Sequence, residues 1–352
     1  MTRGLTAAAL TLLTGGCGAD AAPDPAAWSV TVQAGSLDSD ALFQAVSPVD
    51  SVVWLSGHQG SFARTLDGGE SWSVGVVAGA ETLQFRDVEA FDASTAVLMS
   101  AGEGALSGLF RTEDGGASWI RTFVMDAPEG FLDCMAFWDR DRGLVYGDAV
   151  GGELYLLRTD DGGRSWWRVD PAGLPEAQEG EGGFAASGSC VATGPGGEAW
   201  IVTGDAQRAR VLHTADGGDS WSVGDLPLVG GTGAGATTVG MADDGRGFAL
   251  GGVIGEGEGE RVALTEDSGA SWTSGGQLAL DGAVYGAASA PGPHPRPLFA
   301  VGPGGIDWSR DGGRTWERVD TLTYWAVAFA DLDVAWAVGP GGRLARIEVV
   351  GR

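Results

Sequence analysis

The stretch Thr65-Leu66-Asp67-Gly68-Gly69-Glu70-Ser71-Trp72 occurs, with small changes, six times in this 352-residue sequence. All copies share the pattern Ser/Thr-x-Asp-x-Gly-x-x-Trp. The Asp and Trp residues of the other five copies are Asp114 and Trp119, Asp161 and Trp166, Asp216 and Trp221, Asp267 and Trp272, and Asp311 and Trp316. Successive Asp residues are 47, 47, 55, 51 and 44 positions apart. A period of this length indicates a repeat architecture.

Each residue of the pattern suits a tight turn between two strands. The Asp carboxylate can accept hydrogen bonds from the N–H groups that follow it, and the Ser/Thr hydroxyl can brace the same turn. The glycines allow the positive φ angles that a hairpin needs. The Trp begins the next strand, and we expect it to pack beneath the turn and against the neighbouring repeat, so that the six copies contribute much of the core.

Four short strands surround each copy. In the second repeat the expected strands are residues 85–91, 96–99, 109–112 and 119–123. Four strands in a unit of about 45–50 residues, separated by turn residues, are typical of a β-propeller blade.

Seven such units can be counted from their expected innermost strands, which begin near Leu42, Phe85, Leu132, Phe184, Thr237, Val284 and Trp325. The last unit ends without its outer strand, and residues 28–33 near the N-terminus resemble an outer strand. A strand from the N-terminus that completes the last blade would remove an exposed edge. The sequence therefore predicts an all-β, seven-bladed propeller closed by its N-terminal strand.

The N-terminus has the features of an export signal. Arg3 precedes an apolar run at residues 5–13, and small residues precede Cys17, as in a bacterial lipobox. We expect a signal peptide at 1–17, a short linker at 18–27 and one propeller domain at 28–352, in the periplasm or at the cell surface. Both an acylated Cys17 and an ordinary signal peptide with an incidental Cys17 remain open.

Two cysteines, Cys134 and Cys190, remain in the expected mature domain. Both fall near the start of neighbouring inner strands, where an oxidising compartment could pair them. We favour two small buried thiols over a disulfide.

The composition excludes several classes of partner. The formal net charge is −26 and the pI is about 4.2, so the surface repels nucleic acids and anionic lipids. The three histidines, His58, His213 and His294, show no metal-ligand spacing. The glycine-rich stretch at 231–235 lacks a following helix pattern and is interpreted as a connection between the fourth and fifth blades. We expect neither a cofactor nor a metal.

The repeated turn is the Asp box, and the chain resembles the bacterial neuraminidase repeat superfamily. Its blades, such as residues 336–342 and 110–116, look like those of photosystem II stability/assembly factor propellers and their non-photosynthetic bacterial relatives. That resemblance implies a seven-bladed extracytoplasmic propeller that binds a partner protein. The strongly acidic composition differs from the basic partner-binding surface of that family.

Asp boxes also occur in sialidases, so a glycoside hydrolase acting on extracellular glycans is the alternative function. A sialidase needs three arginines that hold a carboxylate, a Tyr–Glu pair and an Asp. The chain has only four tyrosines, Tyr146, Tyr155, Tyr285 and Tyr324, and no Arg-Ile-Pro-like motif. Sialidase propellers also usually have six blades. We therefore favour a scaffold without catalytic residues.

A propeller places its functional site at one mouth of the central channel. Aligned blades place inner-strand and second-strand residues together there. The candidates are Gln44, Arg86, Asp133 and Trp325 from the inner strands and His58, Glu103, Asp148 and Asp205 from the second-strand ends. We expect a monomer that binds a protein or small polar ligand at this mouth, possesses no nucleic-acid site and meets a membrane only through a lipid anchor.

Overall fold

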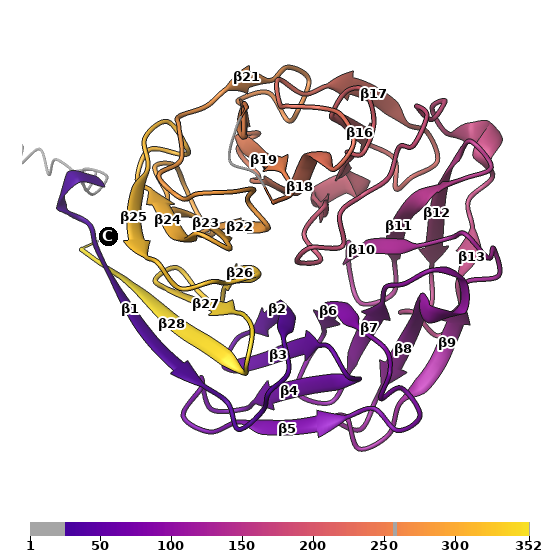
Figure 1. Cartoon of the computed structure of the whole chain (residues 1–352), viewed down its shortest axis with the longest axis horizontal. Coiled ribbons are helices and arrows are strands. Elements are labelled where there is room, and N and C mark those ends of the chain that lie inside the picture. The colour runs from indigo at the N-terminus through magenta and orange to yellow at the C-terminus, as the bar shows by residue number, and fades with distance from the viewer. Residues whose placement is uncertain (1–24, 256–258, 352) are drawn as a thin grey trace, which may run out of the picture.

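Short apolar runs between glycine-rich turns form seven separate sheets. The computed structural model describes residues 25–255 and 259–351, and there seven four-stranded antiparallel sheets stand in a ring around a central axis (Figure 1). Four three-residue 3-10 helices are present in the described residues: Pro25–Ala27, Gly104–Leu106, Pro171–Gly173 and Pro195–Gly197. No helix among the described residues has the length and apolar character needed to span a bilayer. The expected signal peptide and Cys17 lie outside the described residues.

Blades 1 to 4 are each formed by four consecutive strands, ordered from the axis outward. These strands are β2 (Phe43–Val49), β3 (Val52–Gly57), β4 (Ser61–Thr65) and β5 (Ser73–Val76); β6 (Phe85–Ala90), β7 (Ala96–Ser100), β8 (Gly108–Thr112) and β9 (Ile120–Val124); β10 (Leu132–Phe137), β11 (Gly143–Val150), β12 (Glu153–Thr159) and β13 (Trp167–Arg168); β14 (Val191–Thr193), β15 (Ala199–Val202), β16 (Arg210–Thr214) and β17 (Ser222–Asp225).

Blades 5 and 6 repeat this order, and blade 7 takes its outermost strand from the N-terminus. The strands are β18 (Ala234–Met241), β19 (Gly247–Val253), β20 (Val262–Thr265) and β21 (Thr273–Ser274); β22 (Gly286–Ser289), β23 (Leu298–Gly302), β24 (Gly305–Ser309) and β25 (Glu317–Asp320); β26 (Ala326–Phe329), β27 (Val334–Val338), β28 (Arg343–Val350) and β1 (Ser29–Ser36).

The two ends of the chain close the ring. Strand β1 lies antiparallel to β28 over eight residue pairs, from Ser29 opposite Val350 to Ser36 opposite Arg343 (Figure 1). This confirms the predicted fold class and the predicted role of the N-terminal strand. Trp28, just before β1, is buried against blade 7.

The Asp-box turns have the expected hydrogen bonds. The Thr65 hydroxyl donates to Asp67 (2.7 Å) and accepts the N–H of Gly69 (2.9 Å), while the Ser71 N–H donates to Asp67 (2.9 Å). Gly68 and Gly69 have φ angles of 68° and 91°. The hydroxyl and N–H of Ser71, followed by the Thr65 hydroxyl, hold the pKa of Asp67 at about 2. The other five boxes repeat these contacts.

The six Asp-box tryptophans are only half-buried, so their share of the core is smaller than expected. They pack at blade boundaries; Trp72 meets Trp336 of blade 7 with ring centroids 5.6 Å apart. Other tryptophans are buried more completely, among them Trp54, Trp200 and Trp308, which lie within the strands.

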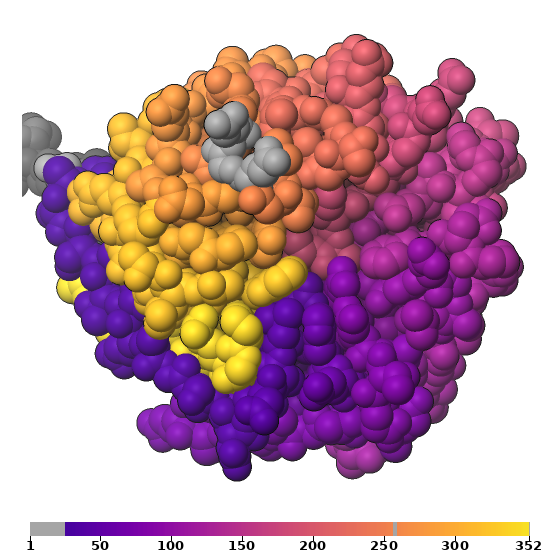
Figure 2. Space-filling model, viewed as in Figure 1, coloured from indigo at the N-terminus to yellow at the C-terminus, as the bar shows by residue number. Residues whose placement is uncertain are grey.

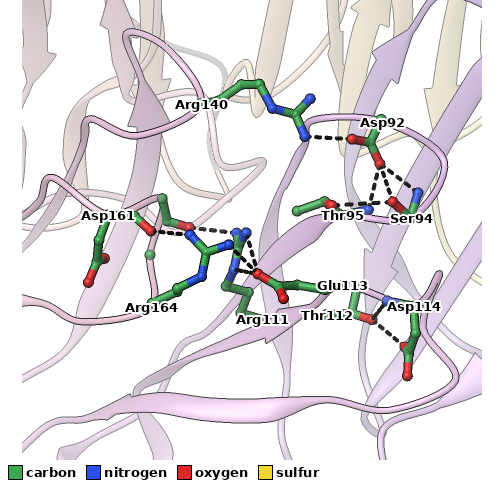
Figure 3. A network of polar contacts seen from close by, with 12 residues as sticks. Asp92, Ser94, Thr95, Arg111, Thr112, Glu113, Asp114, Arg140, Asp161 and Arg164 are labelled. Carbon is green, nitrogen blue, oxygen red and sulfur yellow. Dashed lines mark hydrogen bonds and ion pairs between the residues drawn. The ribbon is translucent and has the colours of Figure 1, made fainter.

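Charged contacts also join neighbouring blades at the Asp-box end of the ring. Between blades 2 and 3, Glu113 accepts hydrogen bonds from Arg111 (3.0 Å) and Arg164 (2.5 Å), and Arg140 pairs with Asp92 (2.6 Å) (Figure 3). Because most of these groups are exposed and screened by solvent, the surface pairs contribute little to stability. The buried Arg111 also donates to the carbonyl of Gly162 (2.6 Å), which fixes it in the blade boundary.

Side chains cap the inner edges of the sheets, where backbone N–H groups face the axis without a strand partner. Each comes from the preceding blade: Ser47 accepts from Ala90, Asp87 from Met135, Cys134 from Cys190, and Thr238 from Ala287. These bonds link successive inner strands where no sheet hydrogen bonding exists.

Most inner strands begin within three residues of the expected positions. The exception is blade 4, where the prediction of a strand from Phe184 is wrong and β14 begins at Val191. Gly182, Gly183 and Gly188 interrupt the segment before β14, and Gly188 has a φ of 74° that does not fit a strand. The stretch at 231–235 connects blades 4 and 5 as predicted, although its last two residues already belong to β18.

Candidate functional site

Bulges in the inner strands place the candidate residues at one level of the channel. The pairing of the inner strand with the second strand shifts at the same point in four blades, between Phe43 and Ala45, Phe85 and Asp87, Leu132 and Cys134, and Ala236 and Thr238. The residue left out of the ladder is Gln44, Arg86, Asp133 or Thr237. A bulge changes the direction in which a side chain points. The shared position of the bulges therefore explains why Gln44, Arg86 and Asp133 meet at this mouth.

The mouth is not open, because residues 181–190 cross it; we call them the plug segment. The Gln44 side-chain amide donates to the carbonyls of Ala185 (3.4 Å) and Ala186 (3.3 Å), and Arg86 reaches the Ala185 carbonyl (3.5 Å). From the other side of the ring, the Ser187 hydroxyl donates to the carbonyl of Tyr285 (2.7 Å). In Figure 2 the middle of the ring is covered by atoms. The plug segment thus contacts blades 1, 2 and 6 at once.

One end of the plug segment is held by a buried ion pair. Both oxygens of the fully buried Glu181 carboxylate accept hydrogen bonds from the Arg210 guanidinium, and the Thr203 hydroxyl donates to the same carboxylate (2.7 Å). With its bidentate partner in place, this buried charge is satisfied.

The other end is held by a disulfide between Cys134 and Cys190, whose Cα atoms are 5.7 Å apart. The expectation of two free thiols is therefore wrong. The sequence did not place Cys190 correctly, because the inner strand of blade 4 was expected to begin at Phe184, seven residues before its actual start. With β14 beginning at Val191, Cys190 lies beside Cys134 of β10.

A pair of carboxyl groups lies under the plug segment. The N–H of Gly183 donates to both Asp133 (3.1 Å) and Asp148 (3.2 Å). Burial, and then repulsion from Asp148, raises the pKa of Asp133 well above its usual range. Burial also raises the pKa of Asp148 to about 6, with a smaller contribution from Asp205. Two carboxyls this close share a proton near neutral pH.

The Tyr146 hydroxyl, next to this pair, is fully buried and has no hydrogen-bond partner among the described residues. Burial, then the charges of Glu181, Asp133 and Asp148, raises its pKa well above the usual value. The phenol therefore stays protonated. No group of three or more metal-ligating side chains occurs in residues 25–255 and 259–351.

Gln44 and His58 form a second polar pair at the mouth. The two side chains are joined by a short hydrogen bond, and burial, followed by the nearby Arg86 charge, lowers the pKa of His58. A neutral His58 imidazole beside the Gln44 amide completes the hydrogen bonding on this side of the plug segment.

Aromatic side chains surround the remaining side of the mouth. The rings of Tyr285 and Trp325 lie 4.6 Å apart, and both Trp325 and Phe184 pack half-exposed against a small cluster of Ala186, Ala283 and Tyr285. Trp325 directly precedes β26 and not a bulge, yet it reaches the same mouth. Phe184 was missed as a site residue because it was expected inside a strand.

Two of the predicted residues remain exposed. Asp205 accepts the N–H of Gly233 (2.6 Å) and follows Gly204, which pairs with Gly182 of the plug segment. Glu103 precedes the short 3-10 helix at Gly104–Leu106 without capping it. Within the described residues Asp148, Asp205 and Glu103 have no arginine partner. The structure therefore brings Gln44, His58, Arg86, Asp133 and Asp148 together, with Asp205 and Trp325 beside them, and leaves Glu103 apart.

Comparison with known proteins identifies the fold and nothing narrower. No protein-family model matches the chain, and no curated protein matches it either. Among solved structures, YCF48 bound to a D1 peptide superposes with a TM-score of 0.62 at 19% identity over 90% of this chain and 96% of that chain. YCF48 from Cyanidioschyzon merolae gives 0.61 at 17% identity, over 90% and 98%.

A third solved structure, the GH74 enzyme of Niastella koreensis, has a TM-score of 0.56 at 15% identity over 88% of this chain but only 43% of its own. The fold of this chain thus resembles that of YCF48, a photosystem II assembly factor and seven-bladed β-propeller, as the sequence predicted.

Proposed function

We propose that the protein is a non-catalytic, extracytoplasmic propeller that binds a partner protein at its plugged mouth. The observation that supports this best is the plug segment itself. It forms hydrogen bonds with Gln44, Arg86 and the Asp133–Asp148 pair, so that these polar groups are engaged with the backbone of the chain itself. The mouth therefore presents an exposed surface, which includes Phe184, Trp325 and Asp205, and this surface is suited to docking a partner protein.

The chemistry of that surface favours a cationic segment of the partner. Half-exposed Phe184 and Trp325 offer ring faces, and Asp205 is an exposed carboxylate without an arginine partner in the described chain. Arginine and lysine side chains bind over aromatic rings and beside carboxylates. The formal charge of −26 would also speed the approach of a basic partner.

The structures similar to this one give independent support for binding. One of the YCF48 structures holds a D1 peptide, which means that this architecture can bind a peptide. We propose export to the periplasm or cell surface on the strength of the N-terminal residues around Cys17, and the Cys134–Cys190 disulfide suits an oxidising compartment.

The test is capture of partners from the cell envelope with the mature chain, repeated with surface variants. Asp205→Asn keeps the turn, because Asn can accept from Gly233 and tolerates the φ of 56°, but it removes the charge. We expect Asp205→Asn and Trp325→Ala each to weaken binding about tenfold, and binding to weaken further as salt rises. Asp160→Asn, an exposed carboxylate at the opposite end of the ring, is the matched control.

The alternative, a glycoside hydrolase, has one observation in its favour: a carboxyl pair beside a buried tyrosine. It predicts cleavage of a fluorogenic glycoside that Asp133→Asn abolishes. Such turnover, with no protein captured, would overturn the scaffold proposal. Capture that is indifferent to Asp205, Trp325 and salt would leave a scaffold but reject the mouth as its docking face.

A further inference from the structure

A cavity of about 40 Å³ lies between blades 5 and 6, at the Asp-box end of the ring and away from the plugged mouth. Its apolar wall is formed by Phe248, Leu264 and Leu298. Arg246, Arg296, Arg314 and His294 line the rest, together with Glu266. So many cationic groups around one cavity are unusual in a chain with 21 Arg against 47 acidic residues.

The same place between blades 2 and 3 shows how the repeat normally fills this space. There the Arg111 guanidinium lies in the blade boundary and donates to the Gly162 carbonyl of the next Asp box. In blade 5 the residue at the position of Arg111 is Leu264, directly before the Thr of the box. Its side chain has no N–H group, so it cannot donate to the carbonyl of Gly312, which is the equivalent of Gly162. The shorter, apolar side chain leaves the boundary open.

A longer loop supplies the polar lining in place of Arg111. Eight residues, 290–297, connect β22 and β23 of blade 6, whereas five, 138–142, connect β10 and β11 at the same place in blade 3. This loop carries His294 and Arg296 over Gly312: a Cβ built on Gly312 would lie 3.2 Å from the His294 imidazole. The boundary between blades 5 and 6 therefore differs from the boundary between blades 2 and 3 in two ways: blade 5 lacks the guanidinium, and blade 6 has the longer loop.

The charges of the cavity do not cancel. Arg296, only 7% exposed at its side chain, donates to Asp244 (3.1 Å) and to the carbonyls of Arg246 and Gly292. Arg246 also pairs with Asp244 (3.3 Å), and Arg314 pairs with Glu266. Three guanidinium groups thus face two carboxylates, which leaves one positive charge in excess.

His294 has no hydrogen-bond or ion-pair partner among the described residues, and its ring lines the cavity. Burial first, and then the charges of Arg246, Arg296 and Arg314, lowers its pKa, with Asp244 opposing weakly. At neutral pH the imidazole is uncharged, with one N–H available to donate.

We propose that this cavity is a binding site for a small oxyanion, a carboxylate or a phosphate group. The guanidinium groups of Arg246 and Arg314 and the His294 imidazole supply donors for the anion, while Arg296 adds buried positive charge. A groove of about 600 Å³ shares Leu264, Glu266 and Arg314 with the cavity and gives access from the blade rim. The overall negative charge does not prevent this, because fields beyond about 8 Å are screened at physiological salt.

The three histidines of the chain make the test specific. NMR signals of the ring Cε1–H of His58, His213 and His294 are assigned with His→Gln variants and followed while phosphate, or separately acetate, is added at constant ionic strength. We expect a saturable shift of the His294 signal alone and a rise in its pKa when the anion is bound. The preferred oxyanion is the one, phosphate or acetate, that saturates the shift of the His294 signal at the lower concentration.

Arg314→Gln and Arg164→Gln form a matched pair, since both residues occupy the same Asp-box position and pair with a glutamate of the preceding blade. Arg314→Gln is expected to lower the affinity for the anion about tenfold. Arg164→Gln is expected to leave that affinity unchanged. A linear shift, equal movement of all three histidines, or equal effects of the two variants would reject the site. None of these results depends on the proposed partner at the mouth.

Discussion

At the scale of single residues, the hydroxyl of each Asp box holds its turn together. Thr159, fully buried, donates to Asp161 (2.8 Å) and accepts the N–H of Gly163 (2.9 Å), itself buried. Thr159→Val keeps the shape but leaves that N–H unsatisfied, so we expect a loss of about 1–3 kcal/mol in the free energy of unfolding. Urea denaturation measures it. The control is Thr122→Val, because the Thr122 hydroxyl is half-exposed and forms one long hydrogen bond of 3.4 Å. This variant should change the free energy of unfolding by less than about 0.5 kcal/mol.

The Asp133–Asp148 pair predicts how stability depends on pH. Burial in the folded state raises the pKa of Asp148 from its ordinary value of 3.8 to about 6. Between these values the folded state keeps a proton that the unfolded state has lost, so stability falls as the pH rises through about 4 to 6. Asp148→Asn removes this loss, because its amide can still accept from Gly183 and can donate to Asp133.

The Asp148→Asn variant should therefore be more stable than the natural chain at pH 8, by roughly 1–3 kcal/mol, and similar to it at pH 4. Urea unfolding at pH 4, 6 and 8 tests this, with Asp160→Asn as an exposed control that should follow the natural profile. An unchanged difference between pH 4 and pH 8 in the Asp148 variant would mean that the carboxyl pair does not share a proton.

Local chemistry explains which residues could be predicted. The Asp-box bonds depend on residues within four positions of one another, so the sequence was sufficient to assign each of them a role. Gln44, Arg86 and Asp133 could be aligned because their bulges recur at one register. What each side chain touches could not be predicted, since those contacts come from a segment about 50 to 140 residues distant, as for Gln44 and Ala186.

At the scale of elements, the plug segment depends on its two anchors. Cys134→Ala with Cys190→Ala removes one of them, and we expect the free energy of unfolding to fall by about 2–4 kcal/mol. Amide hydrogen exchange within residues 182–189 should also become faster, because only the Glu181–Arg210 anchor remains. A reductant should reproduce both effects in the natural chain and add nothing in the double variant. Unchanged exchange would show that the ring contacts alone hold the segment.

The sequence contained one sign of the plug segment. Asp161 and Asp216 are 55 residues apart, against 47 for the two preceding intervals, so there is extra chain between the Asp box of blade 3 and that of blade 4. Three glycines among residues 182–188 argue against a regular strand there. The destination of the extra residues could not be derived, because it is set by contacts with blades 1, 2, 3 and 6.

At the scale of the whole molecule, the number of blades followed from counting repeats. Each blade must bury both faces against its neighbours, and an incomplete last blade next to a spare N-terminal strand leaves one arrangement without an exposed edge. The blade 5–6 cavity was not predictable, because the exchange of Arg111 for Leu264 gains meaning only when the two boundaries are compared in space.

Closure of the ring by β1 leads to the last prediction. A chain that begins at Phe43 lacks β1 and Trp28, so it exposes the edge of β28 and opens the buried space beside Tyr324 and Ile347 in blade 7. An eight-residue edge with unpaired N–H and C=O groups pairs readily with another chain. We expect lower thermal stability, together with dimers or larger species in light scattering, whereas a chain that begins at Pro25 stays monomeric. If the truncated chain instead remains monomeric and equally stable, blade 7 is self-sufficient and the ring does not depend on its N-terminal strand.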